Sequence, residues 1–338
     1  MVNLIAFLCA ILAIAYETHA CHAAATPSKI VIVHGALNAR IAPLWTAQEQ
    51  KFFVKYGVDP EVIFVPQPPV MIGGLSTGDI HILYTGGTVL MGAASGGLDV
   101  KMVAALNSRV GYDVVATPSV KSVKDLRGKR FGIQNFGGGL WMGAMLGLEH
   151  LGLDPQRDNI NFLIIGDQTV LAQALESGRI DATLLDGLFS RKLKQKGFSI
   201  LAELSQANIP YVGLGVVTKT AFVREQAAAL EGVVKGLIEA AAFILSGKNK
   251  PAVMKTFTKY LKLNDAAAAD EGYQDLLSSI DRRPIPSIEG LRNMQRLLKT
   301  RSAKLEGLKV EDLVDDRIVK RLENSGFFNQ LHDTYGIK

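Results

Sequence analysis

The same order of strand, loop and helix occurs twice in the chain, and this repetition constrains the fold more than any other feature. In the second copy, a short apolar strand at 130–133 leads into three consecutive glycines at 137–139 and then into an apolar helix that begins near Leu140. Glycines allow the backbone to approach a ligand closely, and the free amides at a helix N-terminus attract anions. An ordinary tight turn is the alternative interpretation of this loop.

Three short sequences mark the two copies. The pair LW at 44–45 returns at 140–141, YGVDP at 56–60 returns as LGLDP at 151–155, and LSTGDIH at 75–81 returns as LESGRID at 175–181. The landmarks keep their order at offsets of 96, 95 and 100 residues, which indicates two α/β units of related design. Alternating strands and helices predict mostly parallel sheets with helices on both faces, and ligands then bind beyond the carboxyl ends of the strands.

Two extended segments, at 113–117 and 211–218, bracket the second unit, and the chain after them is largely helical. This layout predicts a discontinuous first lobe, 28–113 plus 217–338, with an inserted second lobe, 114–216. Two strands that cross between the lobes would act as hinges of a clamp that closes on a ligand. The length of 338 residues fits two such domains.

The N-terminal segment has the pattern of a signal peptide. Its apolar run at 4–15 is too short to span a bilayer, and small residues follow it, which predicts a signal peptide over 1–25 that ends at Ala20, Ala23 or Ala25. A buried helix or a retained anchor is the alternative. Lipidation of Cys21 is disfavoured because His19 and Thr18 precede it. Cleavage at 25 would remove both cysteines and with them disulfide bonds and thiol chemistry.

Composition and motifs exclude several classes of function. The net charge of +5 is small, and the basic residues alternate with acidic ones, so we expect no nucleic-acid partner. The histidines are dispersed without a metal-binding spacing, and the glycine loop lacks the lysine of a phosphate-binding P-loop. We therefore expect no metal, no cofactor and no catalysis. If the protein were an enzyme, His34 would be the one candidate catalytic residue.

The residues resemble a known family. PLWTA at 43–47, GDI at 78–80, SVKDLRGKRFG at 122–132, GRIDA at 178–182 and DLVD at 312–315 are similar to the periplasmic substrate-binding proteins of ABC importers. Within these, the chain resembles the group of the nitrate, sulfonate, taurine and thiamine-pyrimidine binders. The resemblance covers nearly the whole mature chain and implies an α/β fold of the two-lobed type II periplasmic-binding-protein class. Each lobe would be a mostly parallel sheet flanked by helices, with two hinge strands.

The resemblance implies capture of a ligand in the periplasm and its delivery to the transmembrane subunits of an ABC permease by a monomeric protein. We expect a small organic anion, a carboxylate or a sulfonate, because two glycine loops, TGGT at 85–88 and GGG at 137–139, would face the cleft. A thiamine-pyrimidine type of ligand, an enzyme on the same scaffold, and a partner of a sensor protein are the alternatives. The loop after the first strand, HGALNAR at 34–40, and the triple-glycine loop do not identify nitrate, sulfonate or pyrimidine as the ligand.

The predicted ligand contacts lie in the loops that follow the strands and at the two crossings. Thr85 and Thr88 flank a double glycine at the end of a strand, so their hydroxyls and the amides of this loop could bind an oxyanion. A threonine at this place can also cap a helix. A guanidinium before the first crossing would pair a carboxylate, and Asp186, if it faces the pocket, would favour a hydroxyl, amine or ring nitrogen. The predicted residues are Leu37, Asn38, Ala39, Thr85, Gly86, Gly87, Thr88, Arg109, Tyr112, Asn135, Phe136, Gly137, Gly138, Gly139, Asp186 and Tyr211.

Overall fold

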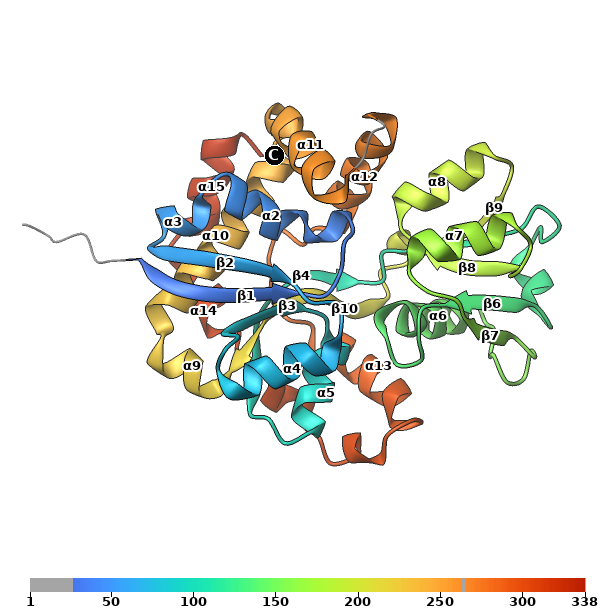
Figure 1. The fold of residues 1–338 in the computed structure, drawn as a ribbon, viewed down its shortest axis with the longest axis horizontal. Helices are drawn as coiled ribbons and strands as arrows, with labels where there is room; N and C mark the ends of the chain where they lie inside the picture. Colours follow the sequence, from blue (N-terminus) through green and yellow to red (C-terminus); the bar gives the residue numbers. More distant parts are fainter. Residues whose placement is uncertain (1–26, 263–265, 338) are drawn as a thin grey trace, which may run out of the picture.

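The computed structural model describes residues 27–262 and 266–337, so the predicted signal peptide lies outside the described residues. The chain forms two lobes, each built on one five-stranded sheet with helices on both sides (Figure 1). The two-lobed α/β fold expected from the sequence is confirmed. The first sheet has the order β2 (Val58–Phe64), β1 (Ser28–His34), β3 (Ile82–Thr85), β10 (Pro210–Lys219) and β4 (Val100–Arg109). The second has the order β7 (Asn161–Ile164), β6 (Arg130–Ile133), β8 (Ala182–Leu185), β5 (Asp113–Ala116) and β9 (Ser199–Glu203).

The repeat seen in the sequence is a repeat of topology. In each sheet the first strand of the unit lies between the second and the third, and a strand that comes from the other lobe lies next to the third. These three strands are parallel to one another, whereas β10 and β5 run antiparallel to their neighbours. Each sheet is therefore mixed, because the incoming strand enters it from the end that faces the other lobe.

Two short segments join the sheets. Residues 110–112 connect the end of β4 to the start of β5, and residues 207–209 precede β10. The carboxyl ends of β1, β3, β6 and β8 all point toward these crossings, so the loops after them face the other lobe (Figure 1). Parallel strands place their ligand-binding loops at this end.

The helices of the first lobe surround its sheet on both faces. Because successive side chains of a strand point to opposite faces, Ile30 and Ile32 of β1 join one core with Trp45, while Val33 joins the other with Met71. These helices are α2 (Ala42–Glu49), α3 (Phe52–Lys55), α4 (Pro68–Thr77), α5 (Gly87–Ser95), α9 (Thr220–Glu225), α10 (Ala227–Leu245), α11 (Lys250–Leu261), α12 (Ala266–Ser279), α13 (Ile288–Lys299), α14 (Arg317–Asn324) and α15 (Phe327–Tyr335). The second lobe carries α6 (Gly139–His150), α7 (Gln168–Glu176) and α8 (Gly187–Gln195).

The apolar pattern of the sequence predicts single helices at 43–56 and at 221–245, and both are interrupted in the structure. The segment 43–56 divides into α2 and α3 because Lys51 adopts a left-handed conformation with φ of 58°. The segment 221–245 divides into α9 and α10 at Gln226. No residue type that ends helices stands at either position, so the pattern of apolar residues alone did not predict these breaks.

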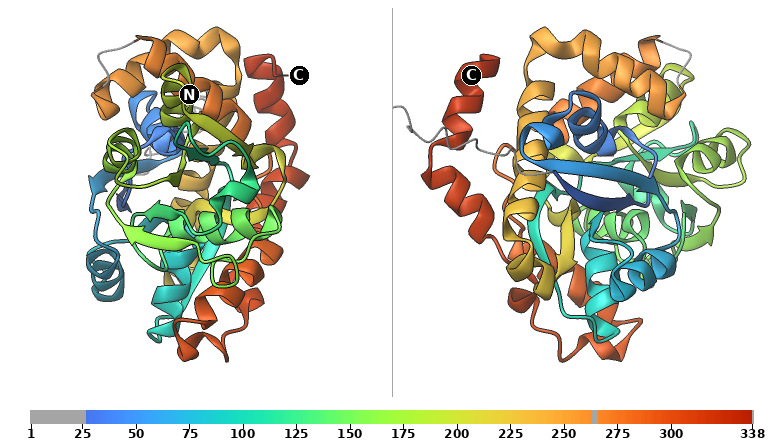
Figure 2. Two further views of the ribbon diagram at one scale, coloured as in Figure 1. Left: turned by 90° about the vertical axis from the view of Figure 1, so that its right-hand side faces the viewer. Right: turned by 60° about the vertical axis from the view of Figure 1, so that its left-hand side comes forward.

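The C-terminal helices lie on the outer side of the larger lobe, where α14 and α15 pack beside α10 (Figure 2). Buried Glu239 of α10 connects three elements, since it accepts hydrogen bonds from Lys55 Nζ at 2.7 Å and from the hydroxyls of Tyr56 and Tyr335, both at 2.6 Å. Within the described residues, no helix is both long enough and apolar enough to cross a membrane.

Candidate functional site between the two lobes

A buried arginine occupies the loop that follows β1. The predicted site residues Asn38 and Ala39 stand directly before it: the side chain of Asn38 accepts a hydrogen bond from the amide of Arg40 at 3.1 Å and caps the short 3-10 helix η1 (Ala39–Ile41). Ala39 is buried and Leu37 is 54% exposed. Arg40 itself is only 6% exposed and is not among the ligand contacts predicted from the sequence. An arginine beside a loop asparagine gives no local sign of burial, because its packing partners come from distant parts of the chain.

The guanidinium of Arg40 lies at the first crossing. Its central carbon is 4.0 Å from the ring centroid of Tyr112, and a Cβ atom added to Gly111 would lie 3.2 Å from its Nη2. Nη2 is 3.8 Å from Oδ2 of Asp275, which is too long for a hydrogen bond. Nε and Nη2 have no hydrogen-bond partner among the described residues. Buried charged groups are normally hydrogen-bonded, so these two nitrogens are available as donors to a ligand.

The second lobe contributes the N-terminus of α8 to this cluster. Asp186 caps the helix, since its side chain accepts a hydrogen bond from the amide of Phe189 at 3.4 Å, and its own amide donates to Gln168 at 2.7 Å. The amide of Gly187 donates to Oδ1 of Asp275 at 3.1 Å. Arg40, Tyr112, Asp186 and Asp275, which we call the polar cluster, therefore come from both lobes and from the crossing between them.

Burial changes the ionisation of the cluster. Asp186 is 1% exposed, and burial together with the nearby carboxylate of Asp275 raises its pKa, while Arg40 opposes the shift. A protonated Asp186 can still cap the helix, because the cap needs only one acceptor oxygen of the carboxyl group. Asp186 lies close enough to Arg40 for the two charged groups to interact, and its contact with a ligand stays a prediction.

The second tyrosine at the crossings lies between the polar cluster and the glycine loop. Tyr211, at the start of β10, is buried, and its hydroxyl donates to the carbonyl of Gly139 at 3.4 Å. Gly139 is the first residue of α6. The tyrosine thus links the incoming strand of the first lobe to the predicted anion loop of the second.

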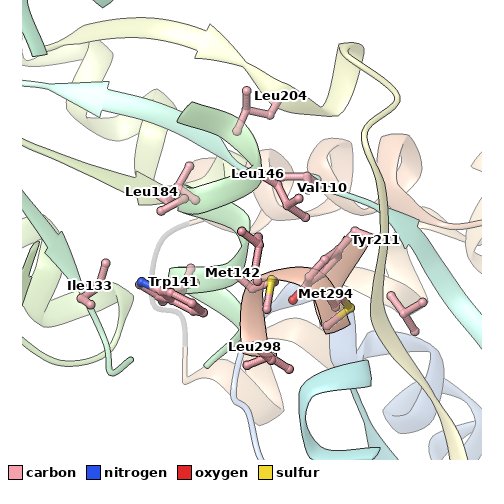
Figure 3. Close-up of a cluster of buried hydrophobic side chains, with 14 of the residues drawn as sticks. Val110, Ile133, Trp141, Met142, Leu146, Leu184, Leu204, Tyr211, Met294 and Leu298 are labelled. Atoms are coloured by element: carbon pink, nitrogen blue, oxygen red, sulfur yellow. The ribbon is translucent and has the colours of Figure 1, made fainter. Parts of the chain in front are cut away.

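The two glycine loops approach each other, but apolar side chains of α13 lie between them. A Cβ on Gly87 would be 2.9 Å from Met294, one on Gly137 would be 3.7 Å from Leu298, and one on Gly86 would meet the backbone of β10. Figure 3 shows Met294 and Leu298 of α13 against Trp141 and Met142 of α6. Thr85 is buried at the end of β3, and Thr88 is half-buried in the first turn of α5. The contact at these loops is therefore largely apolar.

Three further predicted residues lie at the edge of this contact. Asn135 is exposed and folds back over Gly138, the cap of α6. Phe136 is 39% exposed and packs edge-on against Trp141, with the guanidinium of Arg301 at 4.5 Å from its centroid. Arg109 is exposed at the end of β4, where it donates to Asn208 at 3.0 Å and lies 3.5 Å from Asp281. The structure thus places Arg109 beside the second crossing, with partners of its own.

His34 is buried at the end of β1, where Nδ1 is 2.8 Å from the carbonyl of Ala36 and the ring packs between Trp45 and Phe64. Burial lowers its pKa. Among the described residues, no group of three or more histidine, cysteine, aspartate or glutamate side chains is arranged to hold a metal ion.

Two α/β lobes of equal topology, joined by two crossings and facing each other across a buried polar cluster, define the class of the periplasmic binding protein fold. The chain belongs to the NMT1/THI5-like family, whose model matches residues 38–249. No curated protein matches the chain. Among solved structures, the chain is similar to the periplasmic aliphatic sulphonate binding protein SsuA from Escherichia coli, with a TM-score of 0.70 and 18% identity over 87% of this chain and 99% of that one.

Two further structures share the fold. The periplasmic nitrate-binding protein NrtA from Synechocystis matches with a TM-score of 0.65 and 13% identity, over 89% of each chain. DSZB in complex with biphenyl-2-sulfinic acid matches with a TM-score of 0.62 and 14% identity, over 88% of this chain and 99% of that one. At identities this low, the structural similarity establishes the fold but not the ligand.

Proposed function

We propose that the protein is a periplasmic solute-binding protein that captures a small organic anion, a carboxylate or a sulfonate, between its lobes and delivers it to an ABC permease. The observation that carries this proposal is Arg40, a guanidinium that is 6% exposed and has two nitrogens, Nε and Nη2, without a hydrogen-bond partner among the described residues. A guanidinium binds a carboxylate or a sulfonate through parallel hydrogen bonds, and burial strengthens that interaction.

The two aspartates of the polar cluster restrict the chemical class of ligand that could bind there. Asp186 and Asp275 lie close enough to Arg40 to affect its ionisation. A simple anion that bound to Arg40 would therefore also lie next to these two carboxyl groups. A ligand that carries a hydroxyl or an amine beside its acid group would satisfy both charges. Tyr112 and Tyr211 supply aromatic and hydroxyl contacts at the same place. The remaining predicted residues stay proposed contacts, and Arg40 is added to them.

The names of two similar proteins support an anionic ligand, since one is a sulphonate-binding and the other a nitrate-binding protein. By the same analogy, we propose export through the signal peptide at 1–25 and docking of both lobes on permease subunits. The sequence-based bounds, 28–113 with 217–338 and 114–216, move to the crossings, because β10 (Pro210–Lys219) belongs to the sheet of the first lobe. The crossings at 110–112 and 207–209 would serve as the hinges, because they are the only backbone connections between the sheets in the part of the chain that the structure describes.

Recovery of the native ligand tests the proposal. Protein that is purified gently from its source, then denatured, should release a small organic acid that mass spectrometry identifies, and the same acid should bind the refolded protein in calorimetry. Protein with Arg40→Ala, prepared in parallel, should release none. Recovery of a neutral pyrimidine, with equal amounts from both proteins, would contradict an anion held by Arg40.

A further inference from the structure

One side chain of the larger lobe already lies where an anion would bind. Asp275 of α12 accepts a hydrogen bond from the amide of Gly187, the first residue of α8 in the smaller lobe, at 3.1 Å. The side chain of Asp275 is 8% exposed. The N-terminus of a helix attracts negative charge through its free amides and its dipole, so Asp275 occupies an anion site on the opposite lobe.

The geometry shows that the contact is specific. A Cβ on Gly187 would lie 2.8 Å from Oδ1 and 2.9 Å from Cβ of Asp275, so a glycine is needed for α12 to come this close. Further along the same two helices, Arg191 of α8 pairs with Glu271 of α12 at 3.0 Å, at the surface. The two helices thus meet through one buried and one exposed polar contact.

Arg40 lies on the other side of the Asp275 carboxylate, but it makes no hydrogen bond to it. The distance of 3.8 Å from its Nη2 to Oδ2 of Asp275 gives charge attraction without a hydrogen bond, and Oδ2 has no hydrogen-bond partner among the described residues. A carboxylate that can approach Arg40 more closely gains the hydrogen bonds that Asp275 does not make. Such a group would therefore compete well with Asp275 at this position.

We propose that Asp275 is a tethered carboxylate that holds the two lobes together when no solute is bound, and that the acid group of a solute replaces it at Arg40 and at the amide of Gly187. The proposal rests on the proposed function only for the identity of the replacing group. It assigns the carboxylate subsite to Arg40 and the N-terminus of α8. It also means that closure does not by itself signal a bound solute.

Small-angle X-ray scattering of Asp275→Ala, with acetate as the probe, tests this proposal. Without acetate, the variant should have a larger radius of gyration than the wild type, because the buried link between the lobes is lost. Acetate should restore the smaller radius, since it fits the space of the deleted carboxylate, and chloride at equal ionic strength should not. Glu271→Ala, which removes only the exposed pair of the same helices, is the matched control and should keep the wild-type radius.

Gly187→Ala provides a second variant that keeps the carboxylate. Its methyl group would displace Asp275, so it should also enlarge the radius, and acetate should not reverse the change because Asp275 is still present. An Asp275→Ala protein as compact as the wild type, or one whose opening acetate and chloride reverse equally, overturns the proposal. These measurements use no transported solute, so their outcome is independent of whether a native organic acid is recovered.

Discussion

The guanidinium of Arg40 lies over the ring of Tyr112, with 4.0 Å between the central carbon and the ring centroid. Arg40 belongs to the first loop of the larger lobe, and Tyr112 belongs to the segment that crosses to the smaller one. The stacking places the charge at the junction of the lobes, where relative movement of the two sheets would change its surroundings. Gly111 permits this position because it has no side chain to push the guanidinium away.

Arg40→Lys should weaken binding of the recovered ligand by at least about tenfold, because an ammonium cannot reproduce the planar pair of donors. Arg109→Lys is the matched control, since Arg109 lies at the second crossing with Asn208 and Asp281 as partners. Calorimetric titration of both variants measures the difference. Normal affinity in Arg40→Lys with a loss in Arg109→Lys would favour the original sequence-based prediction instead.

Asp186→Asn should stabilise the protein increasingly as pH rises from about 4 to 7. Burial, with a smaller effect from Asp275, raises the pKa of Asp186 to about 7 from a value of 3.8. The folded protein therefore binds a proton more tightly than the unfolded chain, and its stability falls as pH rises through this window and then stays constant. Asparagine keeps the capping oxygen and removes the charge. Urea denaturation at several pH values should show no trend in the difference between the proteins if the carboxyl titrates normally.

Gly138→Val should lower ligand binding while the protein remains folded. A Cβ at this position would overlap Oδ1 of Asn135, so the loop before α6 must rearrange. Gly73→Val, where a Cβ meets nothing within 4 Å, is the control. Circular dichroism and a ligand titration of both variants separate the two effects. Unchanged affinity in Gly138→Val would show that the glycine loop serves only the turn.

Gly290→Ala should destabilise the protein by about 1–3 kcal/mol, because the added carbon would lie 2.6–2.8 Å from the backbone of Tyr211, and backbone cannot move aside as a side chain can. Gly247→Ala meets open space and should change stability by less than about 0.5 kcal/mol. Urea denaturation measures both. Equal stabilities would mean that α13 shifts freely on β10.

Glu239→Gln should destabilise the protein by roughly 1.5–3 kcal/mol, since the hydrogen bonds from three side chains to a buried charged group are weakened at once. Glu231→Gln, in a partly exposed pair with Lys235 and Arg321, should cost less than about 1 kcal/mol. Thermal and urea denaturation can rank the two variants. Ligand affinity should be unchanged in both variants, because Glu239 of α10 contacts α3 and α15 and not the crossings.

The sequence by itself determined the class of fold, because the features that specify it are local. The paired landmarks at 44–60 and 140–155, the glycine stops and the apolar strands depend on neighbouring residues, and they led to two sheets of equal strand order. The strands predicted at 113–117, 130–133 and 211–218 lie within two residues of β5, β6 and β10. The direction of the strands predicts which loops face the other lobe, and Asn38 and Asp186 belong to these loops, while Tyr112 and Tyr211 lie at the two crossings.

Only the tertiary structure decided which of these loops meet in a polar site. Arg40, Asp275 and Gly187 are far apart in the chain and become neighbours through the packing of α12 on α8. Likewise, the apolar face of α13 lies between the two glycine loops, although nothing near residue 290 indicates this. Burial and charge pairing arise from contacts across long sequence separations, and a local pattern of residue types does not contain them.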